Sequence, residues 1–140
     1  MFLRKLNFPI RKWFFVFILA FGLNLIWENL HSFLYVHYQG GAITGFILAR
    51  AALVDALVIL VLIRIFCSLP WFPRHSWLII FFGVAISLII EYWALETNRW
   101  AYGETMPIIP LIGTGLTPTI QLGLLAYLVY LFLLRPKRIR

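Results

Sequence analysis

Three carboxylic acids lie within strongly apolar stretches of the chain, at Glu28, Asp55 and Glu91. An acid surrounded by hydrocarbon is costly, so it usually faces a protein interior or a cavity and serves in binding, proton transfer or a buried pair. A carboxylic acid in apolar surroundings can keep its proton at neutral pH and act as a general acid, while a second carboxylate removes a proton. We therefore predict acid–base chemistry, with Glu28, Glu91 and Asp55 as the catalytic candidates.

Glu28 and His31 are spaced as Glu-x-x-His, the pair that di-iron bundles carry on their helices. Such bundles use two copies of the pair, and the sequence holds one, so we expect no metal site. A single cysteine, Cys67, excludes an intramolecular disulfide and a multi-cysteine metal site. The sequence has no Walker loop, Gly-rich dinucleotide turn or Gly-x-Ser-x-Gly elbow, and the expected chemistry requires no cofactor.

The elements that must position these acids are long apolar segments. The 140 residues are 63% hydrophobic and 12% charged, with a mean hydropathy of +0.93, which is more apolar surface than a small soluble core buries. Four apolar runs, at 13–35, 46–67, 77–95 and 117–134, each approach the roughly 20 residues that cross a membrane as a helix. We predict an all-α fold: an integral membrane four-helix bundle, with residues 1–140 as a single membrane domain.

The basic residues are distributed unevenly about these runs. The net charge is +7, and two arginines, Arg50 and Arg99, lie on one side of the predicted membrane. By the positive-inside rule both termini are cytoplasmic, in a multi-pass protein of the cell's inner or plasma membrane. This explains the basic excess, so we expect no nucleic-acid partner. The other side carries ten basic residues: Arg4, Lys5, Arg11, Lys12, Arg64, Arg74, Arg135, Lys137, Arg138 and Arg140.

Counting along the helices gives the depth of the polar groups. At about 1.5 Å per residue, Glu28 lies roughly 22 Å and Glu91 roughly 21 Å from the inner ends of their helices. Asp55 lies roughly 14 Å below the outer boundary, and Gln121 has a similar or shallower depth. The four runs therefore deliver polar groups to one layer in the outer half of the membrane.

Helical spacing predicts which polar side chains share a face. One face holds Asn24, Glu28, His31 and Tyr35; a second holds Ser87, Glu91 and Asn98 if that helix continues far enough; a third holds Thr117 and Gln121. We also expect Thr117 to cap the last helix, with Pro118 in its first turn.

Arg50 is about 140° from Asp55 around its helix, so we expect its side chain to extend outward instead of joining the acidic face. Ala52 and Ala56 are then free to make a close helix contact beside Asp55.

Two segments resemble membrane cyclases. Asn24-Leu-Ile-Trp27-Glu28 resembles the Asn-x-x-Trp-Glu segment of the small integral-membrane terpene cyclases of meroterpenoid pathways, in which the glutamate is thought to take part in acid catalysis. Glu91, followed by Trp100-Ala-Tyr102-Gly103, resembles the lycopene cyclase domain, and together the two cover about a third of the chain. The Pro-x-Glu-Glu of that domain is replaced here by Pro-Ile-Ile-Pro at 107–110 or Pro-Thr-Ile-Gln at 118–121, so the likeness does not extend to lycopene cyclisation itself.

The residues and the resemblance together favour an intramembrane enzyme that protonates an isoprenoid or other lipid, which then cyclises or isomerises. Its partner would be a membrane lipid or isoprenoid substrate. The sequence is compatible with a monomer and with a homo-oligomer. Tryptophan faces near the acids could stabilise a positive charge on the hydrocarbon. The candidate binding residues are Asn24, Trp27, His31, Trp93, Asn98, Arg99, Trp100, Tyr102 and Gln121.

Two other functions remain open at this point. A small oligomeric membrane protein could use the same acidic layer to bind or transport a cationic or hydroxylated ligand. A structural subunit would use the layer only for hydrogen bonds between helices.

Overall fold

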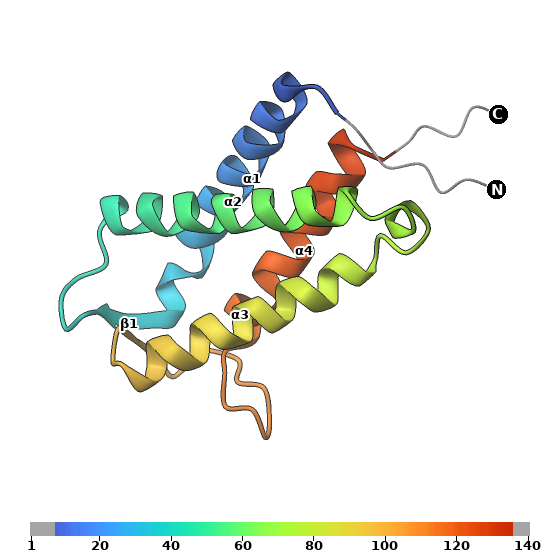
Figure 1. The fold of residues 1–140 in the computed structure, drawn as a ribbon. Coiled ribbons are helices and arrows are strands. Elements are labelled where there is room, and N and C mark those ends of the chain that lie inside the picture. Colours follow the sequence, from blue (N-terminus) through green and yellow to red (C-terminus); the bar gives the residue numbers. More distant parts are fainter. Residues whose placement is uncertain (1–7, 136–140) are drawn as a thin grey trace.

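In a computed structural model that describes residues 8–135, the chain forms four long α-helices, two short 3-10 helices and two strands (Figure 1). All four helices are long and apolar enough to cross a membrane, which indicates a multi-pass membrane protein. The elements are α1 (Ile10–His31), η1 (Ser32–Leu34), β1 (Tyr35–Tyr38), α2 (Gly45–Cys67), η2 (Phe72–Arg74), α3 (Leu78–Glu96), β2 (Trp100–Tyr102) and α4 (Leu116–Leu133).

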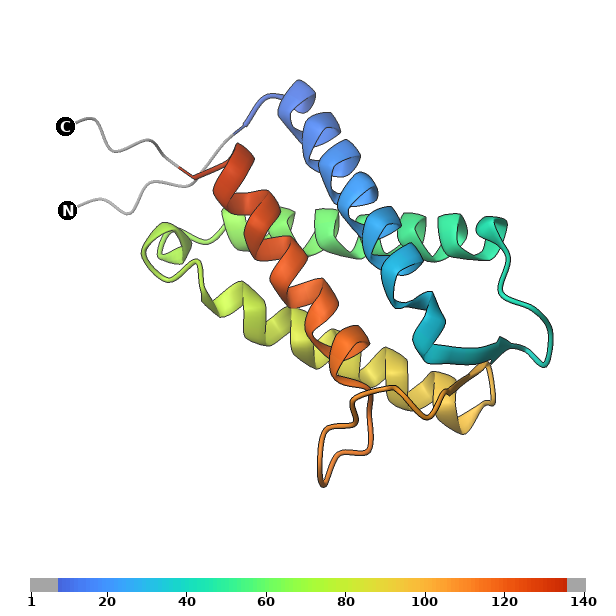
Figure 2. The same ribbon diagram turned by 180° about the vertical axis from the view of Figure 1, so that it is seen from behind.

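The helices pack in two pairs. α1 packs mainly on α2 and α3 mainly on α4, whereas α2 and α3 touch only slightly and diverge toward the strands (Figure 1). We call the end of the bundle that carries β1 and β2 the ribbon end. The start of α1, the end of α4 and the α2–α3 connection lie at the opposite end (Figure 2).

The basic residues follow the same division. Arg11, Lys12, Arg64, Arg74 and Arg135 belong to helix ends and connections at the opposite end, away from the ribbon. The remaining members of the predicted basic set lie outside the described residues: Arg4, Lys5, Lys137, Arg138 and Arg140.

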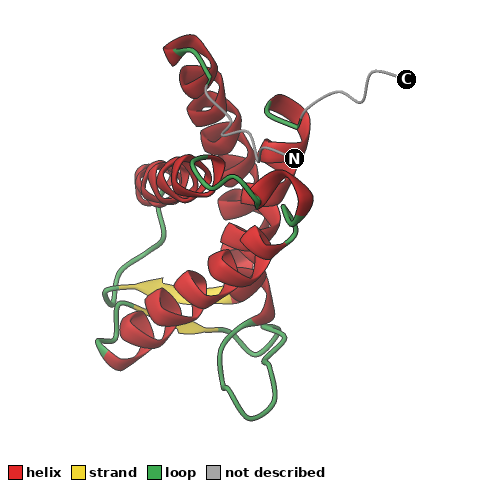
Figure 3. Ribbon diagram, turned by 45° about the vertical axis from the view of Figure 1, so that its right-hand side comes forward, coloured by secondary structure: helices red, strands yellow, loops and turns green. Residues whose placement is uncertain are grey.

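A short antiparallel ribbon joins the two connections at one end of the bundle (Figure 3). Tyr35 pairs with Tyr102 and Tyr38 with Trp100, and the backbone bond from Gln39 N to Arg99 O (2.6 Å) prolongs the contact. The all-α prediction was therefore incomplete. Strands of three and four residues are too short to show an alternating pattern, and their partners are far apart in the sequence.

The segment between β2 and α4 contains no helix or strand. Residues 103–115 form a loop that projects from the bundle, closed at its base by a bridge between Ile108 and Gly115 (Figure 3). Met106 and Thr114 are buried at the base, while Leu111 at the tip is fully exposed. The tip of the loop therefore stands away from the helices, while its base contacts α4.

The predicted end of the first helix and the predicted cap of the last were wrong, whereas α3 ends one residue from its predicted end. α1 ends at His31, so Tyr35 belongs to β1. α3 ends at Glu96, and Asn98 adopts a left-handed conformation (φ 51°) in an exposed turn, so it does not extend the polar face of α3. Gly115, not Thr117, is the N-cap of α4. Thr117 sits inside the first turn and donates a hydrogen bond to the sulfur of Met106 (3.5 Å).

Small residues set the closest helix contacts. Ala52 and Ala56 are fully buried, as the sequence predicts. α3 and α4 meet at Gly83 and Gly123, where a β-carbon added to either glycine would overlap the backbone of the other helix. Close approach of this kind maximises van der Waals contact between membrane helices.

The glycine contact can be tested with a matched control. Gly83→Ala or Gly123→Ala should lower the free energy of unfolding by about 1–3 kcal/mol, because an inserted methyl group has no room to pack. Gly22→Ala, in α1, meets no atom within 4 Å and should be neutral or stabilising by up to about 1 kcal/mol. Thermal unfolding in detergent micelles measures the difference; equal midpoints for all three variants would contradict the assigned contact.

Candidate functional site

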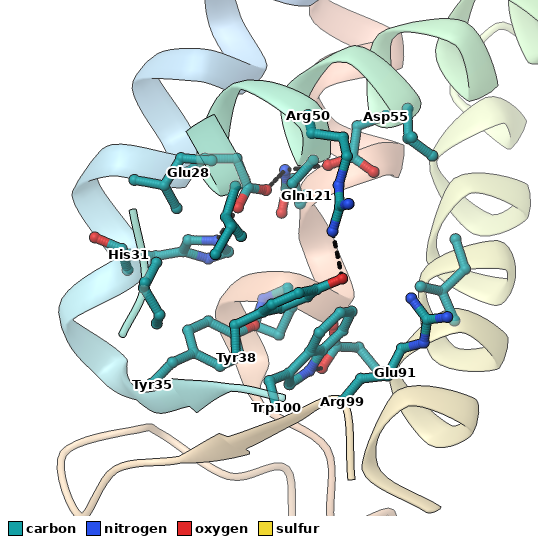
Figure 4. Close-up of a pocket in the computed structure, with 18 of the residues that line it drawn as sticks. Glu28, His31, Tyr35, Tyr38, Arg50, Asp55, Glu91, Arg99, Trp100 and Gln121 are labelled. Carbon is teal, nitrogen blue, oxygen red and sulfur yellow. Dashed lines mark hydrogen bonds and ion pairs between the residues drawn. The ribbon is translucent and has the colours of Figure 1, made fainter. Parts of the chain in front are cut away.

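A cavity of about 420 Å³ lies at the ribbon end, within the size range of small-molecule sites (Figure 4). All four long helices and both strands of the described chain contribute to its wall. Its polar lining comprises Glu28, His31, Ser32, Tyr35, His37, Tyr38, Gln39, Arg50, Asp55, Ser87, Glu91, Arg99, Trp100 and Gln121.

Gln121 is the central hydrogen-bond donor of the site. Its side-chain nitrogen Nε2 lies 2.8 Å from Glu28 Oε1, 2.9 Å from Asp55 Oδ2 and 3.0 Å from Asn24 Oδ1. The amide is in the second turn of α4 and is buried between α1 and α2. One amide group therefore connects three helices and two of the three predicted acids.

The other carboxyl oxygen of Glu28 contacts a neighbour on the same helix. His31 Nε2 lies 3.2 Å from Glu28 Oε2, as expected for residues three apart on one helical face. The second histidine nitrogen, Nδ1, is buried with no hydrogen-bond partner in the described part of the chain, and so is the hydroxyl of Ser87. Both residues line the cavity, so a bound ligand could satisfy these two atoms.

Glu91 is bound by two donors from β2. The hydroxyl of Tyr102 and the indole Nε1 of Trp100 (3.3 Å) both donate to Glu91 Oε2. The two donors reach the same carboxylate because alternate residues of a strand point to one face. Burial, together with the bond to Glu91, raises the pKa of the Tyr102 phenol, so Tyr102 keeps its proton and remains a donor.

Tyr35 belongs to the site, although its spacing suggested only a shared helical face. Its ring contacts those of His31 (5.3 Å between centroids), Trp100 (6.2 Å) and Tyr102 (5.5 Å). Burial first, and the charge of Glu91 second, raise the pKa of its phenol far above 10.0, so it stays protonated. The sequence could not show this position, because it depends on the pairing of β1 with β2.

Arg50 also lines the cavity, together with Asp55. Its guanidinium extends toward the ribbon end and donates to the Tyr38 hydroxyl (2.5 Å) while lying 5.4 Å from the centre of the Tyr38 ring. The angular separation of Arg50 and Asp55 does not keep them apart, because the cavity is wide and the arginine side chain is long.

The other predicted binding residues take different positions. Trp93 is half exposed on the lining, where its ring lies 4.4 Å from the Arg99 guanidinium. Asn24 supports Gln121 from behind the lining, and Trp27 packs edge-on against His31 (6.4 Å). Asn98 lies in the exposed turn after α3, outside the lining.

The described residues contain no group of three or more His, Cys, Asp or Glu side chains placed to hold a metal ion.

Replacing the central amide should destabilise the bundle. Gln121→Leu removes the donor shared by Glu28, Asp55 and Asn24, and we expect a loss of about 1–3 kcal/mol of unfolding free energy because buried acceptors are left without a partner. Asn29→Leu is the control, since Asn29 is exposed and bonds only to the backbone of its own helix. Thermal unfolding of both variants gives the comparison; an equal effect would show that the amide is not a structural centre.

No protein-family model, curated protein or solved structure matches this chain.

Proposed function

We propose that the chain is an intramembrane acid–base enzyme acting on a hydrophobic isoprenoid or lipid by protonation-initiated cyclisation or isomerisation. One observation carries the proposal: Glu28 and Asp55 share the Gln121 donor in the same cavity that Glu91 lines from α3. Two sets of carboxyl groups in different surroundings are the usual arrangement of a general acid and a general base.

The acid is the Glu28–Asp55 pair. Both carboxyl groups lie within 2.9 Å of one nitrogen atom, and two carboxylates so close do not readily ionise together. An amide group has two hydrogens, which do not suffice for the three acceptors around Gln121. A proton held by the pair relieves both conflicts and is the one delivered to the substrate.

The base is Glu91. Two donors on β2 fix the position of its Oε2. Its other oxygen, Oε1, accepts no hydrogen bond from the described residues. That oxygen is available to remove a proton from a carbon atom of the substrate.

The reaction balances with these groups alone. The Glu28–Asp55 pair adds a proton to a carbon–carbon double bond or an epoxide, and the resulting cation either loses a neighbouring proton or is first attacked by a second double bond. Glu91 takes the proton that is lost. The ring of Tyr35 contacts His31, which bonds to Glu28, and the two donors of Glu91, so its hydroxyl is the group we assign to return the proton from Glu91 to the pair.

The walls of the cavity suit a hydrocarbon cation. Ile90 and Leu122 are apolar, and the rings of Tyr35 and Trp100 offer π-faces that attract positive charge. The cyclase-like segments found in the sequence contribute Glu28 and Glu91, one acid from each, which supports the same class of reaction.

We further propose that both termini are cytoplasmic and that the ribbon end faces outward from the inner or plasma membrane. Support comes from the basic residues of the described helix ends and connections, most of which lie away from the ribbon.

A reporter fused after Arg140 tests this orientation. We expect activity of a cytoplasmic reporter and none from a reporter that works only outside the membrane. The inverse pattern would reverse the orientation and turn the cavity toward the cytoplasm.

Glutamine substitutions test proton transfer. Glu28→Gln and Glu91→Gln keep size and hydrogen-bonding capacity but cannot exchange a proton, so product formation should fall by about 100-fold or more while the thermal midpoint stays nearly unchanged. Glu96→Gln is the matched control, because Glu96 is exposed and outside the cavity lining. Mass spectrometry compares lipids from cells with the wild-type chain, each variant or no chain.

Two results would contradict the proposed enzyme activity. Full product formation by either glutamine variant would exclude proton transfer by that residue. An intact lipid that copurifies with the wild-type chain, without any lipid product that depends on the gene, would favour the alternative of a binding or transport protein.

A further inference from the structure

Two arginines, Arg50 and Arg99, line the cavity but have no role in the proposed acid–base chemistry. Arg50 comes from the second turn of α2, and Arg99 follows the end of α3. Both side chains point into the cavity in Figure 4. Neither forms an ion pair with a carboxylate in the part of the chain that the structure describes.

Each guanidinium is held in place by an aromatic ring and by the ribbon. Arg50 lies over Tyr38 of β1, and Arg99 lies over Trp93, with its own backbone carbonyl bonded to Gln39. Stacking on a ring fixes the plane of a guanidinium and leaves most of its N–H groups free to bind an anion. The pair is therefore oriented in advance for an oxyanion.

Their position along the helices corresponds to the membrane–water boundary. Arg50 is five residues into α2, about 8 Å from the start of that helix, and Arg99 is three residues beyond the end of α3. Charged groups of lipids lie at this level when the helices span the hydrocarbon.

The cavity also has an apolar side open to lipid. Val54 of α2 is 51% exposed and Trp93 of α3 is 50% exposed, yet both line the cavity. They stand on the two helices that barely touch and that diverge toward the ribbon (Figure 1). A hydrocarbon chain can pass between these helices while its charged group stays at the arginines.

We propose that Arg50 and Arg99 bind the phosphate or other oxyanion of an amphipathic lipid whose chain lies between α2 and α3. This rests on the proposed function by naming the class of its substrate: an anionic lipid. Glu28, Asp55 and Glu91 repel the anionic group from the inner part of the cavity, so the lipid binds in one orientation.

The direct test measures the binding of dodecyl phosphate to the full chain in uncharged detergent. Intrinsic tryptophan fluorescence reports the binding. We expect saturable binding that is at least about tenfold weaker in Arg50→Gln and in Arg99→Gln, because each substitution removes a charge-assisted hydrogen-bond donor. Arg64→Gln is the control. Arg64 is in the last turn of α2 and lies over Trp13 of α1, so this variant should leave the affinity for dodecyl phosphate unchanged.

Three comparison probes separate the possible ligands. Dodecanol should bind at least about tenfold more weakly than dodecyl phosphate, and inorganic phosphate should compete only at far higher concentration. Equal competition by inorganic phosphate would mean a free-anion site and overturn the lipid. Tighter binding of dodecyltrimethylammonium would mean a cation site and overturn the role of the arginines.

A further variant tests the path of the lipid chain at a position where substitution should not disturb folding. Val54→Trp should fill the gap between α2 and α3 and weaken dodecyl phosphate binding by at least about tenfold without loss of thermal stability, because Val54 is half exposed. Unchanged binding by Val54→Trp would overturn the proposed path of the chain.

The outcome can be told apart from that of the enzyme proposal. Glu28→Gln and Glu91→Gln, which should be inactive, are expected to bind dodecyl phosphate at least as well as the wild type. Binding that depends on the arginines, without a lipid product, would contradict only the proposed enzyme activity. A lipid product together with binding that does not depend on the arginines would contradict only the proposed lipid site.

Discussion

The hydrogen bonds from the Gln121 amide are the interaction on which the rest of the structure depends. Acids inside a membrane protein need partners, and one nitrogen on α4 supplies them to Glu28 on α1 and Asp55 on α2. The same bonds fix the rotation of these three helices about their axes. A purely apolar contact would allow the helices to slide, whereas acceptors on two helices that meet one donor define a single arrangement.

The position of α3 depends on two different contacts, one at each part of its length. Gly83 brings the first half of α3 against α4, and the Tyr102 and Trp100 donors hold Glu91 in its second half. Because α3 barely touches α2, the pairing of β1 with β2 is what links α3 to the α1–α2 pair at the ribbon end. The distance between the two sets of acids therefore follows from the pairing of β1 with β2.

The sequence predicts the helices and the layer of polar groups well, because both follow from local periodicity. Hydropathy gives the spans to within a few residues, and helical spacing puts Glu28 beside His31. It does not give the partners of the acids. Periodicity fixes a residue's direction about its own axis, but the shared donor at Gln121 depends on how separate helices turn toward one another. The roles of Tyr35, Tyr102 and Arg50 depend on a ribbon whose strands are too short to predict.

The order of charges along α2 relates the binding site to the chemistry. Arg50 and Asp55 are five residues apart, so about 8 Å of helix axis separates the proposed oxyanion site from the proposed acid. A substrate anchored at Arg50 would present to Asp55 a carbon several bonds from its charged group, not the carbon that bears it. The geometry therefore favours protonation of a double bond or epoxide within the chain, and the anionic group acts as an anchor, not a leaving group.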